Sequence, residues 1–208
     1  PSQIDTSYLK KIKNLLYLLP YRFILVCGGG AVCREYQTAA KQISKPSNKD
    51  LDWLGIASTK LNAELVRLVF GRDAYEKVAV VPTKKIKTKK KFIIASGWKP
   101  GCSSDLDAVL WAKTFNAKYI FNLTNINGVY TADPKKDKKA KLLETVSWKQ
   151  YRTLISATWK PGLNTPFDPT ASRKAQQLKI SVSIIKGTDL NNLKKALLGK
   201  KFKGTEIF

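Results

Sequence analysis

The chain has 208 residues, of which 43% are hydrophobic, and 38 lysines and arginines against 15 acidic residues give it a formal net charge of +23. This is enough apolar material for a globular protein with a substantial core, so an unfolded tail is excluded. The longest apolar runs have only the length of a strand, which excludes a membrane span.

The cysteine and histidine content argues against a structural metal site. Cys27, Cys33 and Cys102 form no CxxC pair, and the chain has no histidine, so zinc ligation is not expected. An odd set of cysteines and no visible signal peptide fit a reducing compartment, and we expect a cytoplasmic protein. Because the sequence also contains no methionine, we expect that it begins inside the natural chain or that some residues are missing from it.

The positive charge raises the question of a polyanionic partner. The lysines are spread over most of the chain, and arginine, the residue favoured for reading bases, occurs only six times. Six lysines lie within residues 83–91, and such a run is usually a solvated edge. Nucleic acid is therefore not expected as the main partner.

The elements alternate between helix and strand along the chain. In order, the patterns predict a helix at 4–19, a strand at 23–27, helices at 31–43 and 51–70, strands at 78–81 and 92–96, a helix at 105–115, a strand at 118–123, helices at 147–156 and 169–178, a strand at 182–185 and a helix at 190–198. Residues 44–50 and 159–169 are predicted to be loops. This order favours an α/β protein, a three-layer α/β/α sandwich with a mainly parallel central sheet and ligands at the carboxyl ends of its strands. The continuous apolar run at 23–27 is typical of a parallel strand covered on both faces, and the strand at 118–123 is also expected to be buried. Asp5, Thr6 and Ser7 are candidate caps of the first helix.

The stretch that organises the chain is the loop at residues 97–105, between an apolar strand and an amphipathic helix. Gly97 and Gly101 permit backbone angles closed to other residues, and Ser103, Ser104 and Asp105 are candidate N-caps. Several backbone N–H groups should converge at this helix start, where they could bind an anion. An ordinary capped turn is the alternative.

A second glycine loop, Gly28-Gly29-Gly30, follows the strand at 23–27. Three consecutive glycines cost backbone entropy unless the chain bends sharply or lies against a ligand. Arg34, about one helical turn later, could grip phosphate oxygens with its forked guanidinium. A tight turn with a surface arginine is the simpler alternative. Asp52, near the start of the next helix, either complements the helix dipole or accepts hydrogen bonds from a sugar.

A third candidate loop at residues 124–134 follows the strand at 118–123. It combines hydroxyls, amides, an aromatic ring and a carboxylate, which together can hold a ribose and a base. We interpret it as one edge of a nucleotide site.

Taken together, several segments carry a specific resemblance. They are VCGGGAVCREY at 26–36, DWLGIASTKLNAEL at 52–65, GWKPGCSSDLDA at 97–108, TNINGVYTADPKKD at 124–137, DPTASRKA at 168–175 and KGTEI at 203–207. In sequence, order and spacing the chain resembles the uridylate (UMP) kinases of the amino-acid kinase family, especially those of archaeal type, over nearly its whole length.

The resemblance implies a phosphotransferase that moves the γ-phosphoryl group of ATP to UMP, giving ADP and UDP in pyrimidine nucleotide biosynthesis. It implies Mg²⁺ bound with ATP and a homohexamer. It also implies one domain over residues 1–208, with an acceptor-binding part at about 1–115 and an ATP-binding part at about 116–208.

The resemblance also assigns residues to the two substrates. Those expected around UMP are Gly29, Asp52, Trp98, Lys99, Pro100, Gly101, Cys102, Ser103 and Ser104. Those expected around ATP, or where the phosphates meet, are Gly30, Arg34, Thr124, Asn125, Tyr130 and Asp133. We expect the two glycine loops to end neighbouring strands of one sheet, so that Arg34 and Asp105 face a common anion. Both residues should act in catalysis, the first by stabilising the transferring phosphate and the second by orienting cationic groups or magnesium. No residue is assigned as a metal ligand.

One departure from the family pattern concerns the beginning of the chain. Family members open with an apolar strand and a glycine loop that holds the transferred phosphate, and residues 1–5 match the segment that comes after that loop. We therefore expect this strand to be missing from the present sequence. Two alternatives stay open: another kinase of the family acting on a carboxylate, carbamate or isoprenoid phosphate, or a non-catalytic basic protein that binds nucleotides or nucleic acid.

Overall fold

The computed structural model describes residues 4–134, 136–155 and 165–208, which form two compact units. The first unit extends to Thr114 and the second begins at Phe115. Among the described residues, no helix is both long enough and apolar enough to cross a membrane.

The first unit holds two parallel strands and four α-helices among its described residues. Its elements are α1 Thr6–Tyr17, β1 Phe23–Val26, α2 Gly30–Ile43, α3 Asn48–Phe70, the 3-10 turn η1 Gly71–Asp73, β2 Phe92–Ala95 and α4 Ser104–Phe115. All four predicted helices are present.

Strands β1 and β2 pair in parallel, from Phe23 opposite Phe92 to Val26 opposite Ala95. All four residues of β2 are buried, as expected for a strand covered on both faces. The residues of β1 are only half-buried, so the same prediction is wrong for β1. The register brings the ends of the two strands together, and the loop that follows each strand starts from the same edge.

The strand predicted at residues 78–81 is reduced to one bridging residue. Ala79 bridges to Ala95, and its N–H donates to the Ile94 carbonyl over 2.8 Å. The chain turns away immediately afterwards, because the Lys84 N–H bonds to the Val81 carbonyl over 3.1 Å and Pro82, inside that turn, has no N–H for a ladder. A strand therefore cannot extend beyond this point.

The lysine-rich run has a structural role at its end. Lys91 Nζ donates to the Tyr17 and Leu19 carbonyls, at 2.9 and 2.6 Å, where α1 ends. A cation at a helix C-terminus is favourable because it meets unpaired carbonyls and the negative end of the dipole. The expected solvated edge is confirmed for the exposed members, Lys84, Lys85, Lys87 and Lys89, and is wrong for Lys91.

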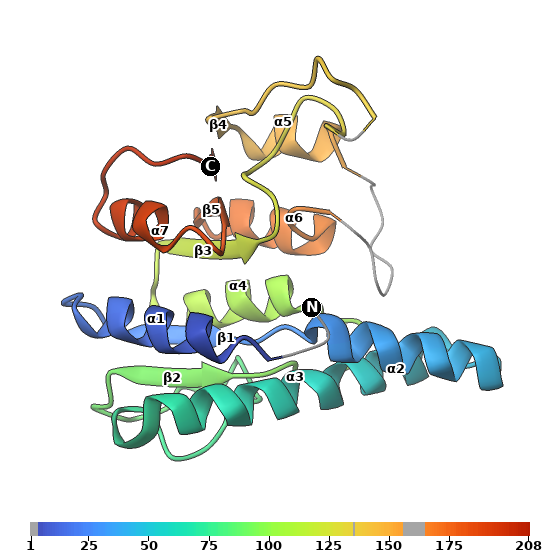
Figure 1. Cartoon of the computed structure of the whole chain (residues 1–208), viewed down its shortest axis with the longest axis vertical. Helices are drawn as coiled ribbons and strands as arrows, with labels where there is room; N and C mark the ends of the chain where they lie inside the picture. Colours follow the sequence, from blue (N-terminus) through green and yellow to red (C-terminus); the bar gives the residue numbers. More distant parts are fainter. Residues whose placement is uncertain (1–3, 135, 156–164) are drawn as a thin grey trace. The chain divides into compact units, whose positions relative to one another are not determined.

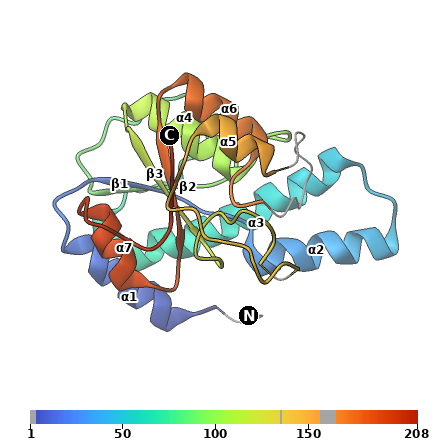
Figure 2. The ribbon, with the colours of Figure 1, turned by 90° about the horizontal axis from the view of Figure 1, so that it is seen from above.

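Helices α2 and α3 lie side by side as an antiparallel pair (Figures 1 and 2). Helix α3 begins three residues earlier than the apolar pattern indicated, because Ser47 and Asp50 form a reciprocal capping box. Helix α1 is capped by Asp5, one of the predicted caps, whose carboxylate accepts from the Tyr8 N–H over 2.8 Å.

The second unit is a four-stranded mixed sheet with helices packed against it. Its described elements are β3 Tyr119–Thr124, β4 Thr145–Val146, α5 Trp148–Thr153, α6 Pro169–Gln177, β5 Ser181–Lys186, α7 Leu190–Leu197 and β6 Thr205–Ile207. The strand order is β3-β5-β6-β4, parallel except for the β5–β6 pair. The predicted mainly parallel α/β character is confirmed.

Two strands of this sheet, β4 and β6, were not predicted. They have two and three residues, too short for an alternation of apolar and polar residues to reveal them. Strand β3 was expected to be buried, but it lies at one end of the strand order and is only half-buried. The end of the helix predicted at 147–156 and most of the loop predicted at 159–169 lie outside the described residues.

Candidate active site

The two glycine loops of the first unit lie next to each other. Val26 and Ala95, the last residues of β1 and β2, are partners in the register, so the loops at 28–30 and 97–104 leave the same edge of the strand pair. A methyl group at Gly28 would lie 4.0 Å from Ser104 Oγ. The expectation that these loops end neighbouring strands is therefore confirmed.

The loop at 28–30 needs glycine for two different reasons. Gly30 has φ +64°, which disfavours residues with a side chain. A methyl group at Gly29 would lie 2.5 Å from Cys33 Cβ, inside contact distance. Asn62 of α3 also holds the loop, because its Nδ2 donates to the Gly28 carbonyl over 2.8 Å. No pattern in the sequence pointed to Asn62.

The start of α2 presents backbone donors that the helix itself does not use. The first bond of the helix runs from the Cys33 N–H to the Gly29 carbonyl, so Gly30, Ala31 and Val32 are left with N–H groups that have no helical partner. Arg34 is exposed on the same helix. Unused amides, a helix dipole and a guanidinium form a set suited to phosphate oxygens.

The loop at 97–104, here called the acceptor loop, is tied to α3 through Asp52. The Gly101 N–H donates to Asp52 Oδ2 over 2.8 Å. Gly101 has φ +82°, so the backbone freedom expected of this glycine is used. Asp52 thus contacts the acceptor loop directly, and complementing the helix dipole is not its only role.

The first residue of the acceptor loop is fixed by close packing. The Gly97 N–H donates to Thr59 Oγ1 over 2.9 Å, and a methyl group at Gly97 would lie 3.0 Å from that oxygen. The positive φ that we expected at Gly97 is not found. Glycine is needed here because α3 approaches the backbone too closely for a side chain.

The next amide is held from α4. The Trp98 N–H donates to Asp107 Oδ2 over 3.1 Å, and Asp107 is fully buried. Burial raises the pKa of the Asp107 carboxyl to about 7, and the Trp98 N–H partly opposes this shift. Neither Thr59 nor Asp107 was among the predicted site residues, since both read as ordinary helix positions in the sequence.

These anchors limit which amides of the acceptor loop could meet an anion. The amides of Gly97, Trp98 and Gly101 bond to side chains of the protein, and the Cys102 N–H bonds to the Lys99 carbonyl over 3.1 Å. These four amides are therefore not available to a ligand.

Two amides of the acceptor loop are still available at the start of α4. Among the three candidate caps, Ser103 accepts from the Leu106 N–H over 3.1 Å. The amides of Ser103 and Ser104 take no partner within the described part of the chain, and both residues are half-buried. An anion would therefore meet the acceptor loop here.

Two further residues of the predicted UMP set contact each other. Lys99 Nζ lies over the Trp98 ring, 4.2 Å from its centroid. A cation at this distance is attracted to the face of an indole. The pair places one positive charge beside the loop, and Pro100 follows it in the turn that Gly101 completes.

In the second unit, the loop at 124–134 is held by Thr205, a buried residue of β6. Thr205 Oγ1 accepts from the Val129 N–H over 2.7 Å and donates to the Leu143 carbonyl over 2.5 Å. A methyl group at Gly128 would lie 2.6 Å from the same oxygen, so this position admits only glycine. Thr205 was not a predicted site residue, although KGTEI is one of the segments that carry the resemblance.

The predicted ATP-side residues line both ends of this loop. Thr124 Oγ1 and Asn125 Oδ1 are 3.3 Å apart at its start, and the Asn127 amide lies 3.4 Å from the Tyr130 hydroxyl. Asp133 is exposed near the end, where its backbone carbonyl accepts from two later amides in a turn. Polar side chains are thus presented along an anchored backbone.

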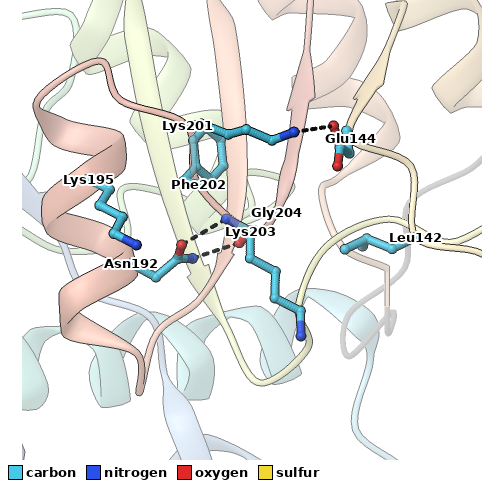
Figure 3. Close-up of a pocket in the computed structure, with 8 residues that line it drawn as sticks. All are labelled: Leu142, Glu144, Asn192, Lys195, Lys201, Phe202, Lys203 and Gly204. Carbon is cyan, nitrogen blue, oxygen red and sulfur yellow. Dashed lines mark hydrogen bonds and ion pairs between the residues drawn. The ribbon is translucent and has the colours of Figure 1, made fainter.

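A cavity of about 300 Å³ lies elsewhere in the second unit (Figure 3). It is lined by Leu142, Glu144, Asn192, Lys195, Lys201, Phe202, Lys203 and Gly204. Figure 3 shows the Asn192 amide bonded twice to the Lys203 backbone, at 2.7 and 2.8 Å. The Lys201–Glu144 pair, at 3.6 Å, is highly exposed and contributes little to stability. None of the predicted site residues lines this cavity.

Comparison with known proteins identifies the family of the chain. The model of the amino acid kinase family matches residues 5–186. The chain belongs to the amino acid kinase family. A uridylate kinase of Sulfolobus acidocaldarius is 32% identical over 191 residues, which cover 90% of this chain and 84% of the relative. One of Hyperthermus butylicus is 30% identical over 193 residues, covering 92% and 85%.

Solved structures agree with this membership. The crystal structure of uridylate kinase from Archaeoglobus fulgidus superposes with a TM-score of 0.80 at 30% identity, covering 97% of this chain and 90% of that one. The UMP kinase of Bacillus anthracis, at 19% identity and a TM-score of 0.76, supports the fold alone. The amino-acid kinase fold predicted from the sequence is therefore confirmed.

In this member of the amino acid kinase family, the two predicted catalytic residues lie on helices that follow the paired strands. Arg34 is in the second turn of α2, and Asp105 is in the first turn of α4. Both helix starts adjoin the glycine loops described above. The structure thus brings the starts of both helices to one edge of the strand pair.

Proposed function

We propose that the chain is a UMP kinase that transfers the γ-phosphoryl group of MgATP to UMP, giving ADP and UDP. The observation that carries the proposal is the pair of glycine loops at the ends of β1 and β2, where unused helix amides lie beside an exposed arginine. Membership of the amino acid kinase family and relatives named uridylate kinases support this acceptor.

The first unit would take the acceptor. Asp52 is suited to accept hydrogen bonds from the ribose hydroxyls, because only one of its oxygens is engaged by Gly101. Gly29 and the acceptor loop would surround the rest of UMP, together with the amides of Ser103 and Ser104, which take no partner among the described residues. Cys102 lies within that loop and is half-buried.

The second unit would take ATP through the loop at 124–134, with Thr124, Asn125, Tyr130 and Asp133 as its contacts. Gly30 and Arg34 would meet the phosphates. The boundary between the compact units, at Thr114 and Phe115, supports a division into an acceptor part and an ATP part near residue 115.

Magnesium would arrive with the nucleotide. The described residues contain no group of three or more cysteine, aspartate or glutamate side chains arranged to hold a metal. Mg²⁺ is usually held by substrate phosphates and one or two carboxylates, and it keeps several waters. Bound there, the ion would neutralise charge on the phosphates.

The chemistry required of the protein is mainly positioning and electrostatic stabilisation, because charge spreads over the transferring phosphoryl group. The Arg34 guanidinium can donate two parallel N–H bonds to oxygens of the transferring phosphoryl group. The amides at the start of α2 add fixed positive partial charges. Asp105 would orient the cationic groups around it.

We also propose that the protein works as a homohexamer in the cytoplasm, in pyrimidine nucleotide biosynthesis. Exposed apolar side chains on the α2–α3 pair support an oligomer: Tyr36 is 61% exposed, Trp53 48% and Leu61 65%. Apolar area of this kind commonly marks an interface. Sedimentation velocity of the purified protein would test the assembly.

A substrate panel tests the proposed reaction. The full-length natural protein is supplied with MgATP and, in turn, UMP, CMP, carbamate, an amino-acid carboxylate and an isoprenoid phosphate, and ADP release is measured. We expect UMP to have the highest kcat/KM. A better carboxylate, carbamate or isoprenoid acceptor would replace the proposal by another kinase activity. No turnover, with a salt-dependent affinity for RNA above that for nucleotides, would favour a binding protein.

A further inference from the structure

One buried carboxyl of the first unit has a partner for only one of its oxygens. Asp107 is 0% exposed; its Oδ2 accepts from the Trp98 N–H over 3.1 Å. Its Oδ1 is buried without a hydrogen-bond partner within the described residues. Leaving such an atom unpaired is unfavourable, so an apolar residue would be the more stable choice at this position if packing were all that mattered.

The bond that Asp107 does make is part of the anchorage of the acceptor loop. Successive amides of the loop are held by Thr59 at Gly97 and by Asp107 at Trp98. Thr59 belongs to α3 and Asp107 to α4. The start of the acceptor loop, just after β2, is therefore hydrogen-bonded to two helices. Asp52 holds the same loop further along.

The bond between the Trp98 N–H and Asp107 also connects the two ends of the acceptor loop. The acceptor loop ends where α4 begins, and Asp107 lies on the first turn of that helix while its partner Trp98 precedes it by nine residues. The carboxyl therefore sets the distance between the two ends of the loop. The amides of Ser103 and Ser104, which would receive an anion, lie between these fixed ends.

The electrostatic surroundings of Asp107 agree with an anchoring role. Burial, and then the Trp98 N–H, are the two causes acting on the pKa of its carboxyl. No ionisable side chain of the described residues contributes to the shift, so Asp107 is not one half of an ion pair there. Within the same part of the chain, the bond from the Trp98 N–H is the one hydrogen bond of the Asp107 carboxyl group.

We propose that Asp107 is a positioning residue for the acceptor: by holding the Trp98 amide it fixes the acceptor loop in the conformation that binds UMP. The inference rests on the proposed UMP kinase activity. It adds a residue that acts through the loop backbone and does not itself touch the nucleotide.

Three variants of the full-length natural protein test this role in steady-state kinetics. Asp107→Ala removes the acceptor of the Trp98 N–H, whereas Asp107→Asn keeps an oxygen that can accept it. Val109→Ala is the matched control, because Val109 is equally buried on the same helix and its truncation leaves the anchor in place. All three variants are compared by KM for UMP, KM for ATP and unfolding midpoint.

The expected results separate positioning from general loss of stability. Asp107→Ala should raise KM for UMP about tenfold, equivalent to about 1.4 kcal/mol of binding, with KM for ATP within twofold. Asp107→Asn should restore KM for UMP to within threefold of the parent, and Val109→Ala should lower the midpoint without changing either KM. Equal changes in both KM values, or an unchanged KM for UMP in Asp107→Ala, would overturn the inference.

Amide hydrogen exchange decides the matter even if Asp107→Ala does not fold. In the unmodified protein without nucleotide, the Trp98 amide should exchange at least tenfold more slowly than the Ser103 and Ser104 amides. A Trp98 amide that exchanges as fast as those two would overturn the anchor itself. If the unmodified protein does not phosphorylate UMP, the proposed function fails, and the exchange measurement still reports whether Asp107 holds the loop.

Discussion

Asp52 and Gly101 are 49 positions apart in the sequence, and the Gly101 N–H donates to Asp52 Oδ2 over 2.8 Å. The bond connects the long helix α3 with the acceptor loop that precedes α4. It uses one oxygen of the carboxylate and fixes the rotation of the side chain. The second oxygen is thereby held beside the acceptor loop, in a position where a sugar hydroxyl could donate to it.

The first prediction concerns acceptor affinity. Asp52→Ala should raise the UMP requirement far more than the ATP requirement, because hydrogen bonds to a charged acceptor are worth about 1.5–3 kcal/mol. That corresponds to an increase of roughly 10- to 100-fold in KM for UMP, measured by steady-state kinetics.

The control for this prediction lies on the same helix. Asp50→Ala removes the capping box of α3, in which Asp50 bonds to Ser47, and should lower thermal stability while leaving the ratio of the two KM values unchanged. If Asp52→Ala affected both substrates equally, the assignment of Asp52 to the ribose would be refuted.

The second prediction concerns the anchor beneath the loop at 124–134. Thr205→Val keeps the shape of the buried side chain but removes the oxygen that accepts from the Val129 N–H. A buried amide left unpaired costs about 1–3 kcal/mol, so the free energy of unfolding in urea should fall by that amount. Thr205→Ser, which retains the hydroxyl, is the control and should lose less.

The third prediction concerns the donor side. Asp133→Ala should weaken ATP binding in calorimetric titration and leave UMP binding nearly intact. Asp137→Ala is the matched control: Asp137 accepts from the Lys139 N–H in the same segment and is not a predicted ATP contact. Should Asp133→Ala weaken both ligands together and lower stability, Asp133 only caps the turn before Pro134.

The order of elements could be predicted because each long segment carries its own periodic pattern. Helix α3 was predicted from the helical spacing of its apolar residues, and strand β2 from its continuous apolar run. Both patterns arise because the apolar residues are the ones that become buried. The short strands β4 and β6 could not be found, because two or three residues are fixed by their partners in the sheet and not by local preference.

The candidate site was predictable where unusual residues cluster in the sequence. Gly29, Gly30 and Gly101 are examples, because their positions require close approach or a positive φ. The residues that hold the loops were not predictable in this way. Thr59 lies on α3, far from the acceptor loop in sequence, and Asp107 occupies what reads as an ordinary position of α4. Their effect depends on which backbone amide each side chain reaches, and only the folded structure supplies that information.

The fourth prediction follows from the raised pKa of Asp107. The pKa rises from an ordinary value of 3.8 to about 7, so the folded state holds this proton more tightly than the unfolded state does. The contribution to stability is complete below about pH 4 and is lost as the pH rises to about 7. Between pH 5 and pH 8 the unmodified protein should lose about 2–3 kcal/mol of unfolding free energy relative to Asp107→Asn, which does not titrate. Urea unfolding of both proteins across this range checks it, and a constant difference would contradict the predicted titration.

The last prediction concerns Arg34 and Asp105, whose helices begin at neighbouring glycine loops. If Arg34 stabilises the transferring phosphate and Asp105 orients the cations around it, each acts mainly in the transition state. Arg34→Ala and Asp105→Ala should therefore each lower kcat by at least 100-fold, with KM for UMP and ATP changing by less than fivefold.

The measurement uses the full-length natural protein. Arg67→Ala is the control for loss of an arginine: Arg67 pairs with Glu64 on α3, and its removal should leave kcat within twofold. A variant of Arg34 or Asp105 that keeps near-parental kcat would show that the residue is only a surface charge or part of a helix start. Because the two residues are assigned different tasks, either assignment can fail while the other stands.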